Sequence, residues 1–529
     1  MNELDTSCFK DMLASAANNL ENRHEEINTL NVFPVPDGDT GTNMNMTFGS
    51  GVAQTLEFKN ENMGDVSKSL SRAMLMGARG NSGVILSQIF KGFAQVLAGL
   101  PTADVSQLAR AFVNGSRVAD KAVMKPVEGT ILTVIRDAAE AARVYAEDPA
   151  AELAGLFAVM KKAADISLQR TPELLPVLKE AGVVDSGGAG LCAILDGFDL
   201  YWQGKPVAKL TAAPQAASAK PKESGYCIDI KVMLNGYASQ EIDIERIKGS
   251  LSRMGDALSV TSANSEMNVH LHSMQPGDVM NQLQRYGEFT DVRIQNMSQP
   301  YEETAAAAPV HEKYAIITVC NGAGIEEMFR SMRVTHFISG GQTMNPSTES
   351  FINAIKEIDA EHIIILPNNG NIILAAQQAQ DLLADQDITI IPSKSIPQGL
   401  SACIAYDEGS DLPTNVAAMN QAISSVKTGE VTYAVKDSMF NGVKIRRSDY
   451  IGLFGKDIVS ATGDLMRTTK EMLVKMIDDS SSIVTVIYGA EVDERTANEV
   501  GRFITDKYHI DVQVVAGKQA IYSYIIGVE

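Results

Sequence analysis

Basic residues are scarce in this chain. Of its 529 residues, 45 are Lys or Arg and 65 are Asp or Glu, so the net charge is −20 at pH 7. This surplus of negative charge disfavours nucleic acid or an anionic membrane surface as the main partner. The sequence also lacks an apolar run of the roughly 18 residues that a membrane span needs, and it lacks a basic-then-apolar start. We therefore expect a cytoplasmic protein that is not an integral membrane protein.

Cysteine is also sparse, and the motif that most often marks a phosphate site is missing. An odd number of scattered cysteines disfavours a disulfide framework. They are Cys8, Cys192, Cys227, Cys320 and Cys403. No Gly-x-x-x-x-Gly-Lys-Ser/Thr segment occurs, which excludes a P-loop as the phosphate-binding element.

The length of the chain predicts several domains. At about 150 residues per domain, it should form three or four units. Residues 205–224 and 299–312 are rich in Ala, Pro, Lys, Ser or Thr and hold few large apolar side chains, which is typical of linkers. They separate three regions, residues 1–204, 225–298 and 313–529.

The first region is predicted to be all-α. Its apolar residues recur at helical spacing, as in the series Phe9, Met12, Leu13 and Ala16, and it contains no alternating β-branched runs. We therefore expect a helical bundle or helical barrel in which special residues lie in loops held by rigid helices.

An acidic loop at residues 31–44 interrupts the helical patterns. Asp37 and Asp39 flank Gly38, which lets the backbone turn so that both carboxylates converge. Paired carboxylates suit Mg²⁺, which takes oxygen ligands and usually keeps positions for substrate phosphates. The side chains that follow could bind phosphate or complete the metal shell; they are Thr40, Thr42 and Asn43. The competing interpretation is an acidic turn between helices.

Three more loops open helices. Residues 77–83, 125–130 and 182–190 are rich in glycine or polar residues and precede helical patterns. Free amides and the positive end of the helix dipole make such a start an anion site. Each loop alone is more often a simple cap or turn. Four of them in one helical domain, one with paired carboxylates, predict a shared nucleotide site.

These segments resemble a known family. Residues 37–44, Asp-Gly-Asp-Thr-Gly-Thr-Asn-Met, together with 80–83, Gly-Asn-Ser-Gly, and 182–185, Gly-Val-Val-Asp, resemble the nucleotide-binding domain of the dihydroxyacetone kinase family. The longer segments 31–44, 76–85 and 123–131 are similar to the ATP-binding subunit of bacterial fatty acid kinase. This resemblance implies a DhaL-like helical barrel that holds ATP through Mg²⁺ ions on aspartates. It also implies phosphorylation of a fatty acid carboxylate that a separate fatty-acid-binding protein presents.

The loops and the resemblance together give a set of candidate residues. Asp37 and Asp39 are predicted to hold Mg²⁺. In the related family a third aspartate precedes this pair, and Asn31 is the residue here that comes nearest to its position. Arg79 and Lys125 are candidates for neutralising charge during phosphoryl transfer. A carboxylate acceptor is already ionised at neutral pH and needs no general base. The residues predicted to bind the nucleotide are Thr40, Gly41, Thr42, Asn43, Gly80, Asn81, Ser82, Gly83, Thr130 and Asp185.

The middle region changes to a strand pattern. The order β-α-β-β-α-β over residues 225–298 predicts an α+β domain of the ferredoxin-like class. Cys227, His270 and His272 form a reasonable three-ligand zinc set, against the simpler interpretation of two surface histidines and a free thiol. Resemblance to the middle domain of fatty acid kinase favours zinc.

The last region, residues 313–529, alternates strands and helices and predicts an α/β arrangement. Loops after its strands, at 321–324, 340–348, 368–371 and 393–399, are dominated by amides, hydroxyls and glycines. The carboxyl ends of parallel strands usually form the functional edge of a sheet, so these loops favour a binding or docking surface. The resemblance implies that this region docks the lipid-carrying partner.

Three other functions compete with a fatty acid kinase. The first is a component of a dihydroxyacetone-type kinase that acts on a small hydroxycarbonyl, although the roughly 325 residues after the helical domain exceed its minimal form. The second is a non-catalytic adapter that senses nucleotide. The third is a zinc hydrolase centred on Cys227, His270 and His272. A homodimer is plausible for a kinase of this type.

Overall fold

The computed structural model describes most of the chain. The described residues are 3–31, 38–60, 62–210, 226–234, 244–251, 254–263, 266–296, 311–340, 345–434, 437–440, 443–455 and 457–529. They belong to two compact units, one made of Met1–Leu210 with His311–Glu529 and one of Thr211–Val310. The first unit thus combines the helical region with the C-terminal α/β region, while the exact domain boundaries stay predictions.

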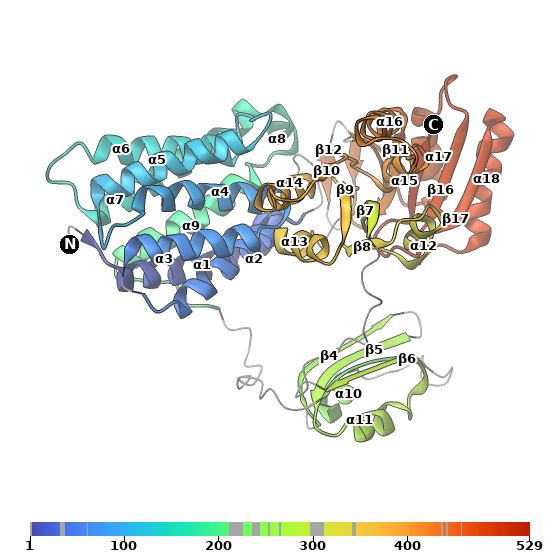
Figure 1. Ribbon diagram of the computed structural model, residues 1–529, viewed down its shortest axis with the longest axis horizontal. Coiled ribbons are helices and arrows are strands. Elements are labelled where there is room, and N and C mark those ends of the chain that lie inside the picture. The colour runs from blue at the N-terminus through green and yellow to red at the C-terminus, as the bar shows by residue number, and fades with distance from the viewer. Residues whose placement is uncertain are drawn as a thin grey trace. The chain divides into compact units, whose positions relative to one another are not determined.

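The predicted all-α region is confirmed as a set of packed helices, drawn in blue to green in Figure 1. Buried Phe9, Phe93, Phe112, Phe157 and Phe198 follow one another through its core with ring centroids 4.9 to 6.4 Å apart. Full burial of one such ring stabilises the fold by about 1.5–3 kcal/mol. The helices are α1 (Thr6–Asn28), α2 (Thr40–Glu57), α3 (Met63–Met76), α4 (Gly80–Leu97), α5 (Val105–Ala122), α6 (Ile131–Tyr145), α7 (Leu153–Leu174), α8 (Pro176–Ala181) and α9 (Ser186–Trp202). Two short strands, β1 (Glu3–Leu4) and β2 (Ala103–Asp104), pair antiparallel.

The C-terminal region begins with the parallel sheet that its sequence predicts. Its strands are β7 (Glu312–Cys320), β8 (His336–Ser339), β9 (Ala360–Leu366) and β10 (Ile388–Ile390), in the order β10-β9-β7-β8. The central strand β7 is buried from Tyr314 to Cys320, as expected for a parallel strand covered on both faces. The accompanying helices are α12 (Ala323–Ser331), α13 (Thr348–Lys356), α14 (Ile373–Leu382), α15 (Ile396–Ile404) and α16 (Leu412–Ser425).

A second sheet of mixed direction completes this unit. Its order is β15-β14-β11-β18-β16-β17, and β16 and β17 are parallel to each other. The strands are β11 (Lys427–Tyr433), β14 (Tyr450–Phe454), β15 (Asp457–Thr462), β16 (Ile483–Tyr488), β17 (Asp511–Ala516) and β18 (Tyr524–Val528), with helices α17 (Leu465–Met476) and α18 (Glu494–Tyr508). A separate hairpin joins β12 (Ser438–Phe440) to β13 (Val443–Ile445).

The parallel-sheet domain packs on the helical region through α13 and α14, which lie beside α3 and α4 (Figure 1). Ala78 and Val84 from the helical side share one buried hydrophobic cluster with residues of the C-terminal side such as Ile352 and Ala376. The side chain of Gln378 donates a hydrogen bond of 2.7 Å to the main-chain oxygen of Leu75. This contact brings loops of the C-terminal region close to the helix N-termini described below.

The second unit is a small α+β domain with a fully antiparallel sheet, in the order β4-β5-β3-β6. Its elements are β3 (Tyr226–Leu234), α10 (Ile244–Leu251), β4 (Asp256–Ala263), β5 (Glu266–Ser273), α11 (Pro276–Leu283) and β6 (Gly287–Asn296). The alternating residues Ile228, Ile230 and Val232 are buried, as the strand pattern predicts. Membership of the ferredoxin-like class stays a prediction.

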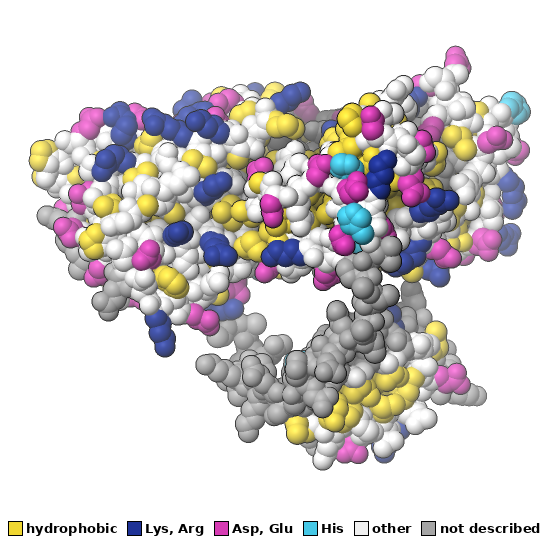
Figure 2. All heavy atoms as spheres, viewed as in Figure 1, with side chains coloured by type: hydrophobic (Ala, Val, Ile, Leu, Met, Phe, Trp, Pro, Cys, Tyr) yellow, Lys and Arg dark blue, Asp and Glu magenta, His cyan; other side chains and the backbone are white. Residues whose placement is uncertain are grey.

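Exposed apolar side chains are scattered over the visible face of the first unit among charged and polar ones (Figure 2). Within the described part of the chain, no helix combines the length and the apolar character that crossing a membrane requires.

Candidate functional site

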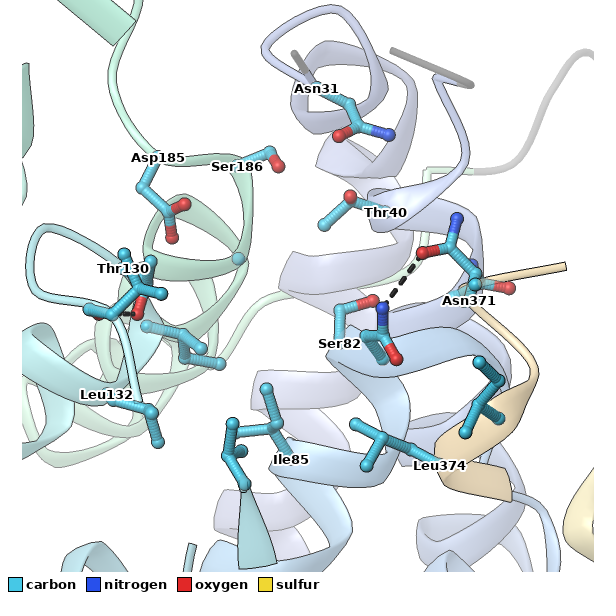
Figure 3. A pocket seen from close by; sticks show the side chains of 18 of the residues that line it. Asn31, Thr40, Ser82, Ile85, Thr130, Leu132, Asp185, Ser186, Asn371 and Leu374 are labelled. Carbon is cyan, nitrogen blue, oxygen red and sulfur yellow. Dashed lines mark hydrogen bonds between the residues drawn. The ribbon is translucent and has the colours of Figure 1, made fainter. Parts of the chain in front are cut away.

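A cavity of about 350 Å³ lies between the helical region and α14 (Figure 3). It collects residues from all four loops that the sequence singles out, and this convergence could not be read from sequence spacing. The lining residues from the helical region are Asn31, Asp39, Thr40, Asn43, Asn81, Ser82, Ile85, Val123, Met124, Lys125, Val127, Thr130, Ile131, Leu132, Asp185, Ser186 and Gly187. Those from the C-terminal region are Gly370, Asn371, Ile373, Leu374 and Gln377.

Four helices begin at this cavity, namely α2, α4, α6 and α9. Their first turns contribute Thr40, Ser82, Ile131 and Ser186 to the lining, and none of these turns carries an acidic side chain. The caps of α2, α4 and α6 make no side-chain hydrogen bond to the helix start. Since amides and the positive dipole end attract anions, the starts of α2, α4 and α6 favour an anion in the cavity, while the start of α9 is already capped by Asp185.

The cavity has a polar part and an apolar part. Figure 3 shows Asn31, Thr40 and Asn371 around one side of the space, with Ile85 and Leu132 at the opposite side. Leu374 of α14 adds to the apolar wall. An apolar slot beside a cluster of amides and hydroxyls suits a ligand with a flat ring at one end and anionic oxygens at the other.

Asp39 is the carboxylate of the acidic loop that the structure describes. Asp39 is only 7% exposed, and its Oδ2 accepts a hydrogen bond of 2.6 Å from Nδ2 of Asn345. Asn43, one turn further along α2, is also buried and lines the cavity. Asp37 lies outside the described residues, so the predicted pairing of the two carboxylates stays a prediction.

Asp185 caps α9 and is buried at the cavity wall. Its Oδ2 accepts a hydrogen bond of 2.7 Å from the amide of Gly188. Burial raises the pKa of Asp185 to about 6, although hydrogen bonds from the amides of Gly188 and Ile131 lower it in part. The side chain is therefore mostly ionised at neutral pH, and its burial in that state costs stability.

The pKa of Asp185 predicts a pH-dependent gain in stability for Asp185→Asn. Because the pKa of Asp185 in the folded state is raised from 3.8, the protonated side chain contributes stability that is fully present below the unfolded-state pKa. This contribution is lost as pH rises through about 6. Asparagine keeps the cap without the charge. We expect the variant to unfold at nearly the same temperature as wild type at pH 4 and to be more stable by about 3 kcal/mol at pH 8.

The matched control is Asp493→Asn at the exposed cap of α18. Hydrogen bonds from Thr496 lower the pKa of Asp493, so its contribution to stability is present at neutral pH and is lost as pH falls. Thermal unfolding from pH 4 to pH 8 should therefore give the opposite sign for this variant. Equal pH profiles for wild type and Asp185→Asn would show that Asp185 has an ordinary pKa.

The loop at 125–130 is fixed by Glu128. Arg136 donates a hydrogen bond of 2.8 Å to Glu128 Oε1, and Thr133 donates one of 2.7 Å to Oε2. These bonds lower the pKa of Glu128 to about 2, and the bond from Arg136 has the largest effect. The anchored loop holds Lys125 and Thr130 at the cavity, and Lys125 is the one cation among the described lining residues.

Five predicted site residues do not line the cavity, and each has another role. Arg79 points to the C-terminal region, where its Nη1 donates a hydrogen bond of 2.8 Å to the main-chain oxygen of Asn345. Thr42 pairs with Asn28 of α1 through side-chain and amide hydrogen bonds of 2.9 and 3.1 Å. Gly41, Gly80 and Gly83 are packing positions, and Gly80 has the left-handed φ of 58° that glycine adopts freely.

Sequence reasoning missed the part of the wall that comes from the C-terminal region. Asn81 Nδ2 donates a hydrogen bond of 2.9 Å to Asn371 Oδ1, which is the dashed line that ends at Asn371 in Figure 3. The amide-rich loop 368–371 is a visible signal, but its residue types favour a surface for a partner. Within the described structure, its Gly370 and Asn371 face the cavity instead.

The zinc set lies in the second unit and is only partly described. The strand register pairs Cys227 with His272 and Asp229 with His270, so all three predicted ligands lie on neighbouring strands β3 and β5. The side chains of Cys227 and His270 lie outside the described ones. Among the described side chains, no group of three or more His, Cys, Asp or Glu is arranged to hold a metal ion. The zinc set therefore stays a prediction.

Comparison with known protein families gives a consistent result. Residues 34–199 match the DAK2 domain. Residues 223–304 match the FakA-like middle domain of fatty acid kinase, and residues 315–529 match the FakA-like C-terminal domain. The helical region with its cavity is therefore a domain of the dihydroxyacetone kinase type.

Relatives match over the whole length. Protein YloV of Bacillus subtilis (strain 168) is 39% identical over 551 residues, covering 99% of each chain. An uncharacterized protein of Staphylococcus aureus (strain MRSA252) is 40% identical over 550 residues, covering 100% of each chain. The chain belongs to the FakA-like family of fatty acid kinase proteins. A DegV family protein from Thermus thermophilus, solved in a study of fatty acid binding, is 12% identical with a TM-score of 0.30 over 41% of this chain and 99% of its own, a likeness too slight for argument.

Proposed function

We propose that this protein is a Mg²⁺-dependent kinase that uses ATP to phosphorylate the carboxylate of a fatty acid. The acid is presented by a separate fatty-acid-binding protein, and the product is an acyl phosphate. The observation that carries the proposal is the convergence of four helix N-termini and Asp39 on one cavity with an apolar slot. Membership of the FakA-like family supports the choice of acceptor.

The shape of the cavity supports one orientation of ATP. The adenine ring fits between Ile85, Leu132 and Leu374 in the apolar slot. The phosphates then face the helix starts, where Thr40, Ser82 and the amides of the first turns supply hydrogen-bond donors. Asn81, Asn43 and Thr130 add further polar side chains to the lining.

The residues at the polar end fit a magnesium ion. Asp39 is a buried carboxylate, and Asn345 beside it has a buried Oδ1 that accepts no hydrogen bond from any described residue. Carboxylate and amide oxygens are the ligands that Mg²⁺ prefers. Bound there, Mg²⁺ would neutralise charge on the phosphate oxygens. Asp37 is expected to join this set from outside the described residues.

The transfer itself needs mainly positioning and charge neutralisation. A carboxylate oxygen of the fatty acid attacks the γ-phosphorus of ATP, the bond from that phosphorus to the β,γ-bridging oxygen breaks, and ADP leaves with the electron pair. No proton has to be removed, because the carboxylate is already ionised at neutral pH. Lys125, held at the cavity by its anchored loop, is placed to balance negative charge on the phosphates.

An acyl-phosphate assay tests this function. The purified chain is mixed with Mg-ATP and a fatty-acid-binding protein loaded with fatty acid, and the product is trapped with hydroxylamine as a hydroxamate. We expect hydroxamate that depends on ATP, Mg²⁺ and the loaded partner. Tight binding of Mg-ATP without hydroxamate, or turnover with dihydroxyacetone in place of the fatty acid, would refute the proposed acceptor.

A further inference from the structure

Asn345 connects two parts of the chain that lie far apart in sequence. It belongs to the C-terminal region, is only 2% exposed, and donates from Nδ2 to Oδ2 of Asp39 at 2.6 Å across a separation of 306 residues. The guanidinium of Arg79 donates to the main-chain oxygen of Asn345 at 2.8 Å. Asn345 is thereby held to the helical region through both its side chain and its main chain.

The other polar atom of this amide has no partner among the described residues. Asn345 Oδ1 is buried and accepts no hydrogen bond from any of them. Nδ2 must face Asp39, because a carboxylate accepts hydrogen bonds, so the assignment of the two atoms is fixed by chemistry. Buried acceptors without partners are rare and call for an explanation such as a bound ion.

The surroundings of Asn345 are rich in amide groups. A Cβ placed on Gly80 would lie 2.6 Å from Nδ2 of Asn43 and 3.4 Å from Nδ2 of Asn345. Both amides therefore flank the same short stretch of backbone at the start of α4, next to Asp39. Beside these amides, the oxygens that a divalent cation could take as ligands are the carboxylate of Asp39 and the buried Oδ1 of Asn345.

We propose that Asn345 is a ligand of the divalent cation, supplied to the nucleotide site by the C-terminal region. The inference rests on the proposed function and assigns it a residue outside the helical domain. When the cation binds, it replaces the hydrogen bond between Asn345 and Asp39, and Asn345 Oδ1 and an Asp39 oxygen both contact it. Closure of the C-terminal region on the helical region is then coupled to loading of the site.

A titration with Mn²⁺ in the presence of ADP tests the proposal without turnover. The electron spin resonance signal measures the Mn²⁺ that stays free. Asn345→Leu removes the oxygen and should weaken Mn²⁺ binding about tenfold or more. Asn345→Asp keeps an oxygen and adds charge next to Asp39. It should bind Mn²⁺ at least as tightly as wild type, melt at a lower temperature without cation, and gain more thermal stability from Mn²⁺.

The matched control is Gln378→Leu, which disturbs the same interface away from the cavity by removing the hydrogen bond to Leu75. It should keep Mn²⁺ affinity within about twofold of wild type, because the side chain of Gln378 bonds to Leu75 and Gln88 and not to Asp39. If Asn345 is only an interface contact, all three variants will behave alike, and the proposal is wrong. Unchanged affinity in Asn345→Leu would also reject it.

The design separates this proposal from the kinase proposal. Wild-type affinity in Asn345→Leu with lost affinity in Asp39→Asn would overturn the role of Asn345 and leave the proposed function standing. Absence of Mn²⁺ and ADP binding in wild type would overturn both. If Asn345→Leu fails to fold, Asn345→Asp still decides, because a larger thermal response to Mn²⁺ than in wild type supports the proposal and a smaller one contradicts it.

Discussion

Asp39→Asn is expected to lower the rate of acyl-phosphate formation by about 10³-fold, which corresponds to roughly 4 kcal/mol of transition-state stabilisation. The carboxylate is buried and lines the cavity, and asparagine of the same shape lacks the charge that is proposed to hold Mg²⁺ there. The fold should survive, because the side chain of Asp39 makes no capping hydrogen bond to α2. The measurement is the initial rate of hydroxamate formation at saturating ATP and loaded fatty-acid-binding protein.

Asp104→Asn is the matched control for this substitution. Asp104 caps α5, lies outside the cavity lining, and can be replaced by another good capping residue. Its activity should stay within about twofold of wild type. If Asp39→Asn retained more than about a tenth of wild-type activity, Asp39 would not hold the essential cation.

Gly41→Ala is expected to destabilise the helical region by about 3 kcal/mol or more and to abolish binding of ATP. A Cβ at this position would lie 2.1 Å from the main-chain oxygen of His24 and 3.0 Å from Oδ1 of Asn28. Since the first contact is to backbone of α1, it cannot be relieved by a side-chain movement. The start of α2 must shift, and Thr40 and Asn43 shift with it away from the cavity.

Gly49→Ala in the same helix is the control for Gly41→Ala. A Cβ at Gly49 would meet nothing within 4 Å. This substitution should be neutral or stabilising by up to about 1 kcal/mol, because alanine favours helix more than glycine does. Thermal unfolding and an ATP titration of both variants decide the point. Equal stability of the two would mean that α1 and α2 are not packed as closely as described.

The sequence predicted the parts that depend on local pattern. Helical spacing indicated the all-α region. Four loops that precede helices predicted one shared nucleotide site, and residues of all four, among them Asp39, Ser82, Thr130 and Asp185, line one cavity. The buried runs of the parallel sheet were equally clear, because such strands are apolar on both faces. The roles of the cavity residues toward a ligand remain proposals.

The sequence could not show which side chains turn away from the cavity. Thr42 has the same hydroxyl as Thr40, yet its hydroxyl and its amide form hydrogen bonds with the side chain of Asn28. These bonds exist because α1 packs on α2. Arg79 was a plausible partner for phosphate, but it contacts the main chain of Asn345. These outcomes depend on tertiary contacts and not on spacing along the chain.

The sequence also could not predict contacts between segments that are far apart along the chain. Asn345 and Asn371 lie in loops whose residue types also make ordinary turns, so nothing local distinguishes them from caps. Their partners, Asp39 and Asn81, precede them by 306 and 290 residues. The pairing of the short strands β14 and β15, with a register shift at Gly452, likewise depends on the sheet around them and not on local pattern.

Photolabelling with 8-azido-ATP and Mg²⁺, followed by mapping of the labelled tryptic peptides, tests the central claim most directly, because the azide marks where the adenine ring binds. With the ring between Ile85, Leu132 and Leu374, we expect label in the peptides 80–91, 122–136 or 357–394, and we expect excess ATP to prevent it. Label in other peptides, or label that ATP does not displace, would contradict the assignment of this cavity as the nucleotide site.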